Sequence, residues 1–164
     1  MNRRFHAFGL LVLLAASLTA APVLAQDEEV TVPELRVATL DGPVFDLSAK
    51  RGQWVVVNYW ATWCSPCLKE MPDLRAFAES RDDVALIGLA YEDISDEDMR
   101  AFLNKHPAGY PIAIVDVYNP PKDFPAPRGL PMTWLIAPDG HVAKRFLGPV
   151  TGRDLAQAIS AASS

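Results

Sequence analysis

Apolar residues in this 164-residue chain recur in short runs that are separated by turn residues, and the period of these runs changes along the sequence. Residues 54–61 and 84–91 are nearly continuous apolar runs, typical of strands buried on both faces, and residues 111–116 form a shorter strand of the same kind. Two further pairs of runs enclose turn signals and predict β-hairpins. These pairs are 35–40 with 43–47 around Asp41-Gly42, and 132–137 with 141–147 around Pro138-Asp139-Gly140.

Three segments carry the marks of helices. Residues 68–80 have apolar side chains close to helical spacing, and Pro72 is expected to kink this helix. Ser95 is a candidate N-cap for a helix that reaches about residue 106, and Thr151 for a helix over 152–162. Residues 118–129 contain four prolines and read as an irregular loop. This order of elements predicts an α/β sandwich with a mixed central sheet flanked by helices and an N-terminal β-hairpin.

The N-terminal segment has the pattern of an export signal. Residues 1–25 combine two early arginines with an uncharged apolar stretch and small residues before Gln26. An uncleaved membrane anchor is the alternative, although the stretch falls short of the ~20 residues that a spanning helix needs. Either reading places the protein outside the cytoplasm, and we expect a periplasmic location. Residues 26–33 are predicted to be a flexible tether, and residues 34–164 a single domain.

Net charge and cysteine content further limit the classes of partner and of chemistry that the sequence allows. The net charge of −5 argues against nucleic acid or an anionic membrane surface as a partner. Half of the residues are hydrophobic, so a core can form without structural disulfides. The two cysteines of the chain, Cys64 and Cys67, nevertheless stand three positions apart. This spacing is more typical of a redox-active pair than of a structural disulfide.

The two cysteines stand where a predicted strand passes into a predicted helix. Cys64 falls at the helix N-terminus, where free backbone N–H groups and the helix dipole favour a thiolate. Cys67 follows one turn later on the same face, close enough to close a disulfide. The alternatives are a purely structural disulfide or half of a zinc site. Zinc would need two more ligands, and the histidines show no metal-ligand spacing, so no metal site is predicted.

The segment Trp60-Ala61-Thr62-Trp63-Cys64-Ser65-Pro66-Cys67-Leu68-Lys69-Glu70-Met71-Pro72 closely resembles the active-site segment of exported thioredoxin-like reductases, the TlpA/ResA-like group. Pro72 matches the proline that kinks the active-site helix in that fold. Residues 129–133 resemble the cis-proline segment of the family, and 138–140 the turn that follows it. The resemblance implies a thioredoxin-like sandwich and thiol–disulfide oxidoreductase activity.

The same resemblance implies roles for individual residues. Cys64 would be the exposed nucleophile and Cys67 the buried resolving thiol. Leu130-Pro131 would be a cis peptide against the disulfide, with the Leu130 backbone pairing to an extended substrate segment and Trp63 contributing to substrate binding. By spacing alone, Pro131 would be interpreted as a trans proline at the start of a strand.

Two features depart from the pattern of classical thioredoxins. Asn58 stands where those proteins carry a buried aspartate. In the exported group an acid at the end of the next strand can act near the cysteines, and Glu92 matches that position, with Asp93 as its nearest rival. A carboxylate there could take the proton from Cys67, whereas the plainer reading is a solvated acid at a strand end. The proline-rich loop 118–128 is longer than usual and either shapes substrate choice or is a plain surface loop.

These features together predict an exported enzyme that reduces protein disulfides through Cys64 and Cys67. No cofactor beyond the redox-active disulfide is expected, and the chain is expected to act as a monomer. The resemblance implies a membrane-embedded thiol electron donor, with cytochrome c maturation or preparation of an oxidase copper site as the task. The alternatives are a disulfide-donating oxidase and a Cu(I) metallochaperone, the latter having only two soft ligands.

Overall fold

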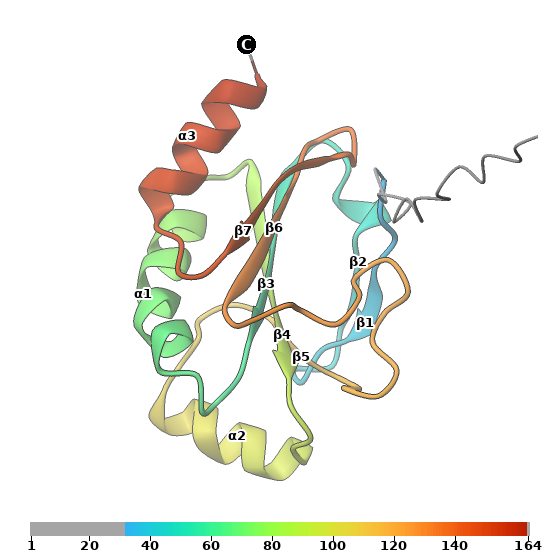
Figure 1. Cartoon of the computed structure of the whole chain (residues 1–164), viewed down its shortest axis with the longest axis vertical. Helices are drawn as coiled ribbons and strands as arrows, with labels where there is room; N and C mark the ends of the chain where they lie inside the picture. Colours follow the sequence, from blue (N-terminus) through green and yellow to red (C-terminus); the bar gives the residue numbers. More distant parts are fainter. Residues whose placement is uncertain (1–31, 164) are drawn as a thin grey trace, which may run out of the picture.

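The computed structural model describes residues 32–163, and the predicted signal segment 1–25 lies outside them. Pro33, the last residue of the predicted tether, is already buried. The predicted helices and strands are present, with ends shifted by a few residues (Figure 1). They are β1 (Arg36–Ala38), β2 (Val44–Asp46), a short 3-10 helix (Ser48–Lys50), β3 (Trp54–Trp60), α1 (Ser65–Glu79), β4 (Val84–Tyr91), α2 (Asp96–Lys105), β5 (Ile112–Val115), β6 (Met132–Ile136), β7 (Val142–Leu147) and α3 (Gly152–Ala162).

The five longer strands form one mixed sheet in the order β5-β4-β3-β6-β7. Strands β3, β4 and β5 are parallel, whereas β6 runs antiparallel to β3 and β7 antiparallel to β6. The β1–β2 hairpin is a separate antiparallel pair. Because β3 is central and every one of its residues is buried, its continuous apolar pattern is that of a strand covered on both faces. The predicted fold class is confirmed.

The two faces of the sheet are covered by different parts of the chain. In Figure 1, α1 and α3 lie against one face, and the β1–β2 hairpin lies on the other side. Side chains of β3 alternate accordingly: Val57 and Tyr59 pack with Phe45 of the hairpin, whereas Val56 packs with Leu74 of α1. The proline-rich loop also covers the hairpin face, because Phe124 is fully buried and stacks 4.7 Å from the ring of Trp134.

Helix ends follow the predicted caps. The Ser95 side chain accepts a hydrogen bond from the backbone of Asp98 at the start of α2. Thr151 and Asp154 form a capping box at the start of α3. Helix α1 begins at Ser65, earlier than the apolar spacing alone predicts, because Cys64 acts as its N-cap. It continues through Pro72 to Glu79, so the proline does not end the helix.

The sheet topology brings two distant segments to one edge. The chain leaves the carboxyl end of β3 for the turn that carries Cys64. Since β6 is antiparallel to β3, its first residue, Met132, lies opposite Tyr59 near that same end. Residues 129–131, which precede Met132, are thereby placed next to the start of α1.

Candidate functional site

Cys64 and Cys67 form a disulfide at the start of α1, with their Cα atoms 5.3 Å apart. The Cys67 backbone N–H donates to Cys64 Sγ over 3.3 Å, so the sulfur serves as the helix N-cap. Cys64 retains 4% of its surface and Cys67 none. The asymmetry agrees in direction with the roles that the resemblance implies, although Cys64 is far less exposed in the disulfide form than expected. An N-cap position favours a thiolate at Cys64 once the disulfide opens.

The Leu130–Pro131 peptide bond is cis, as the resemblance implies and spacing alone does not. Leu130 packs against the apolar cluster that contains both cysteines. The Pro131 carbonyl accepts a hydrogen bond from the Gly148 N–H at 2.9 Å, which ties this segment to the end of β7. The substrate-binding role of Leu130 and Pro131 stays a prediction.

The two tryptophans that flank the cysteines differ sharply in exposure. Trp60 is fully buried in the cluster that contains the disulfide. Trp63, immediately before Cys64, exposes 69% of its surface, whereas Trp54 and Trp134 are buried. Trp63 is therefore free to contact a substrate, and Trp60 is part of the packing that shields the disulfide.

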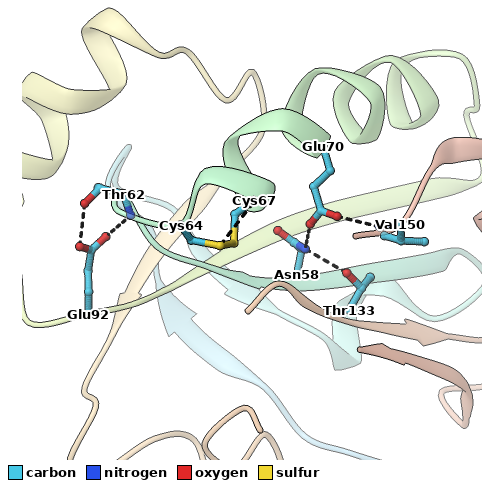
Figure 2. Close-up of a disulfide and its surroundings, with 8 residues drawn as sticks. All are labelled: Asn58, Thr62, Cys64, Cys67, Glu70, Glu92, Thr133 and Val150. Carbon is cyan, nitrogen blue, oxygen red and sulfur yellow. Dashed lines mark hydrogen bonds between the residues drawn. A yellow bond between two sulfur atoms is a disulfide. The ribbon is translucent and has the colours of Figure 1, made fainter. Parts of the chain in front are cut away.

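Glu92, the predicted proton acceptor, has a different partner in the structure. Its two carboxylate oxygens accept hydrogen bonds from Thr62, one from the backbone N–H at 2.7 Å and one from Oγ1 at 2.8 Å. Figure 2 shows the carboxylate directed at Thr62 and away from the sulfur atoms. A role for Glu92 in proton transfer stays a prediction.

A second acid near the disulfide, Glu70, was missed from the sequence. Glu70 lies in α1 one turn beyond Cys67 and exposes only 6% of its surface. Its Oε1 accepts from Asn58 Nδ2 at 2.8 Å, and its Oε2 accepts from the Val150 N–H at 2.8 Å (Figure 2). Burial raises the pKa of Glu70 to about 7, although the two hydrogen bonds oppose the shift.

A signal for Glu70 existed in the sequence. The buried positions of α1 are Cys67, Glu70, Met71 and Leu74, which is the i, i+3, i+4, i+7 pattern of a core-facing stripe. An acid inside such a stripe must be buried or must distort the helix. A search for apolar residues alone does not detect Glu70.

Asn58 links Glu70 to the centre of the sheet. Besides the bond to Glu70, Asn58 Nδ2 donates to Thr133 Oγ1 of β6 at 2.9 Å. None of the described residues donates a hydrogen bond to Asn58 Oδ1. The Tyr110 hydroxyl is buried nearby, and the pKa of Tyr110 is raised by burial and further by the charge of Glu70. Asn58, at the position of the buried aspartate of classical thioredoxins, is thus hydrogen-bonded to Glu70 of α1.

Within residues 32–163, no group of three or more His, Cys, Asp or Glu side chains is placed to hold a metal ion. No helix in the same range is long and apolar enough to cross a membrane. The reactive groups described above are the Cys64–Cys67 pair and one buried acid, Glu70, a helical turn away.

A Cys-x-x-Cys pair caps the helix after the central strand of a thioredoxin-like sheet, and Leu130 of a cis-proline segment packs in the same cluster. This combination defines a thiol–disulfide oxidoreductase. The comparisons agree. The chain belongs to the AhpC/TSA family, whose profile matches residues 29–145. The thiol:disulfide interchange protein DsbE of Vibrio cholerae serotype O1 is 32% identical over 132 residues, covering 79% of this chain and 70% of that protein.

A second relative supports the same class, and a solved structure supports the fold. The thiol-disulfide oxidoreductase ResA of Bacillus thuringiensis is 30% identical over 130 residues, covering 75% of this chain and 71% of that protein. A solved thiol:disulfide interchange protein of the thioredoxin family from Chlorobium tepidum superposes with a TM-score of 0.67. It is 21% identical and covers 85% of this chain and 100% of that one, which supports the fold. The predicted TlpA/ResA-like resemblance is confirmed.

Proposed function

We propose that this thiol–disulfide oxidoreductase works as a reductase of protein disulfides outside the cytoplasm. The observation that carries the exchange chemistry is the contrast between the two sulfur atoms, and the resemblance to exported reductases supports the reducing direction. Cys64 Sγ accepts a backbone hydrogen bond at the helix N-terminus, whereas Cys67 is fully enclosed. Only Cys64 is therefore suited to meet a substrate, and Cys67 is suited to act on Cys64 from within.

The reaction transfers two electrons from the dithiol to the substrate. The Cys64 thiolate attacks one sulfur of the substrate disulfide, forming a mixed disulfide and releasing one substrate thiolate, which takes a proton from water. Cys67 loses its proton and attacks Cys64 Sγ, which breaks the mixed disulfide and releases the second substrate thiolate. The enzyme ends with the Cys64–Cys67 disulfide that the structure contains.

The proton of Cys67 needs an acceptor in a buried place. Glu70 lies one helical turn away, and its pKa of about 7 suits it to take up and release a proton near neutral pH. We assign this step to Glu70 in place of Glu92, because Glu70 is buried one helical turn from Cys67, whereas the Glu92 carboxylate is directed at Thr62 and away from the sulfur atoms (Figure 2).

The reduced enzyme must be regenerated after each turnover. The resemblance to exported reductases supports a membrane-embedded thiol donor as the source of electrons and a periplasmic location. It supports cytochrome c maturation, where haem-attachment cysteines must stay reduced, as the first task to examine, and oxidase copper-site preparation as the second. Monomeric action is part of the same proposal.

Two variants test the order of attack. Cys67→Ser should trap a protein substrate as a stable mixed disulfide through Cys64, whereas Cys64→Ser should trap almost none. Equal trapping by both variants would contradict the assignment. The direction of electron flow is tested by the reduction potential of the Cys64–Cys67 couple. A value below that of glutathione supports a reductase, and a value near the about −120 mV of strong oxidants would instead make the protein a disulfide donor.

The Cu(I) alternative has its own test. Two thiolates bind Cu(I), but a carrier usually adds further soft ligands. Titration of the reduced protein with Cu(I) should give tight stoichiometric binding without disulfide exchange if the protein is a metallochaperone.

A further inference from the structure

Glu92 forms two hydrogen bonds with the turn that carries Cys64. Glu92 directly follows β4, and Thr62 lies two residues before Cys64. Both carboxylate oxygens of Glu92 bond to Thr62, at 2.7 Å to the backbone N–H and 2.8 Å to Oγ1. The hydrogen bonds are partly buried, and bonds to a charged carboxylate are stronger than neutral ones. This pair therefore fastens the β3–α1 turn to the end of β4.

Trp63 is the residue whose orientation the two Glu92–Thr62 hydrogen bonds would fix. It stands between Thr62, which Glu92 holds, and Cys64, whose N–H donates to the Ala61 carbonyl at 3.1 Å. With 69% of its surface exposed, Trp63 is an unusual residue to leave in water unless it contacts a partner. Tryptophan is among the side chains that contribute most to protein–protein binding, and a rigid side chain loses less entropy when it binds.

We propose that Glu92 is a positioning residue, which fixes the Thr62–Cys64 turn so that Trp63 presents a preformed apolar contact to the protein substrate beside the reactive sulfur. The proposal rests on the proposed function, because it takes a protein disulfide as the substrate. Glu92 then acts on substrate binding, whereas a proton acceptor would act on the resolution of the mixed disulfide. The two roles make different predictions for the same substitutions.

Glutamine separates these roles. In Glu92→Gln the amide oxygen can still accept from the Thr62 N–H, and the amide nitrogen can donate to Thr62 Oγ1, because a hydroxyl also accepts. Two hydrogen bonds to Thr62 can therefore form in Glu92→Gln, whereas none can form in Glu92→Ala. A proton acceptor is lost in both variants. Asp93→Ala removes the neighbouring exposed acid and serves as the matched control.

The experiment measures the reduction of insulin disulfides by the reduced protein, as KM and kcat. Glu92→Ala should raise KM about tenfold with little change in kcat, which is the size expected for losing a charge-assisted hydrogen bond. Glu92→Gln and Asp93→Ala should stay near the wild type. The rate with bis(2-hydroxyethyl) disulfide, which has no side chain for Trp63 to contact, should fall much less than the rate with insulin.

Further variants keep the test decisive if Glu92→Ala is unstable. Thr62→Val removes the hydroxyl and keeps the N–H, so KM should rise by a smaller factor, and Thr62→Ser should restore it. Trp63→Ala should raise KM, and adding Glu92→Ala to it should raise KM little more, because both remove one contact. The proposal is overturned if Glu92→Gln is as impaired as Glu92→Ala, or if KM is unchanged in all these variants. Failure of the reduced wild type to reduce both insulin and bis(2-hydroxyethyl) disulfide would instead overturn the proposed function.

Discussion

Replacing Glu70 by glutamine tests the buried acid through its effect on stability. Burial raises the pKa of Glu70 to about 7 in the folded protein, from 4.5 for an exposed glutamate. Between these two values the folded state holds a proton that the unfolded state has released. The free energy of unfolding must therefore fall as the pH rises through this window, by about 3 kcal/mol from this one group.

Glutamine has the shape of glutamate and does not titrate, so the fall attributable to Glu70 should vanish in Glu70→Gln. The site can accept the amide. Gln at position 70 can accept from Val150 N–H and donate to Asn58 once the Asn58 amide turns over, and Asn58 Oδ1 can then also accept from the Thr133 hydroxyl. Any difference in these hydrogen bonds is independent of pH and cancels when two pH values are compared.

The assay is urea unfolding of the oxidised wild type and Glu70→Gln at pH 4 and at pH 8. The variant should gain about 3 kcal/mol relative to the wild type between the two pH values. Comparing the two proteins is essential, because aspartates with lowered pKa, such as Asp46 beside Ser48, change the stability of both in the opposite direction.

The matched control is Glu79→Gln, at an exposed glutamate of the same helix that pairs with Arg75 at 3.9 Å. Exposed i, i+4 pairs contribute only about 0.3–0.5 kcal/mol, so this variant should shift little relative to the wild type. The reasoning about Glu70 is refuted if the difference between Glu70→Gln and the wild type stays constant from pH 4 to pH 8.

Two further predictions concern the same layer of the core. Asn58→Asp places a second carboxyl against Glu70. Because two like charges repel, urea unfolding should show a loss of stability that is larger at pH 8 than at pH 4. Equal losses at the two pH values would mean that the two carboxyl groups do not interact. Gly88→Ala would bring a Cβ within 2.6 Å of Ile112 Cδ1 and 2.9 Å of Trp60 Nε1, and overpacking should cost about 1–3 kcal/mol. In the control Gly129→Ala the new Cβ meets Leu147 at an ordinary 3.5 Å, so a thermal melt should show Gly88→Ala alone strongly shifted.

The strands and helices were predictable because each has a strong local cause. The buried run at β3, the Asp41-Gly42 turn of the first hairpin and the side-chain caps at Ser95 and Thr151 act within a few residues. The start of α1 at Ser65 was predictable from the cysteine motif, which places Cys64 at the helix N-terminus, and not from the apolar spacing, which begins at Leu68. That the Cys64 sulfur itself caps the helix was not predictable, because a thiol is not among the usual capping residues.

The site was predictable only in part. The cysteines follow from their spacing, but the cis bond at Pro131 required the resemblance, because an X-Pro sequence does not reveal its isomer. Topology correctly brought Glu92 to the edge of the sheet that carries the cysteines. It could not decide whether the carboxylate faces a thiol or Thr62, because both lie within one turn of chain.

The two acids lie on opposite sides of the disulfide and differ in what surrounds them (Figure 2). Glu70 is enclosed, and its desolvation outweighs its two hydrogen bonds, so its proton is exchangeable near neutral pH. Glu92 lies nearer the solvent, and its charge is used to hold two donors of one residue. Among the described residues, the two carboxylates have no hydrogen-bond partner in common. The proposed proton transfer by Glu70 and the proposed substrate contact through the turn at Thr62 should therefore respond independently to substitution.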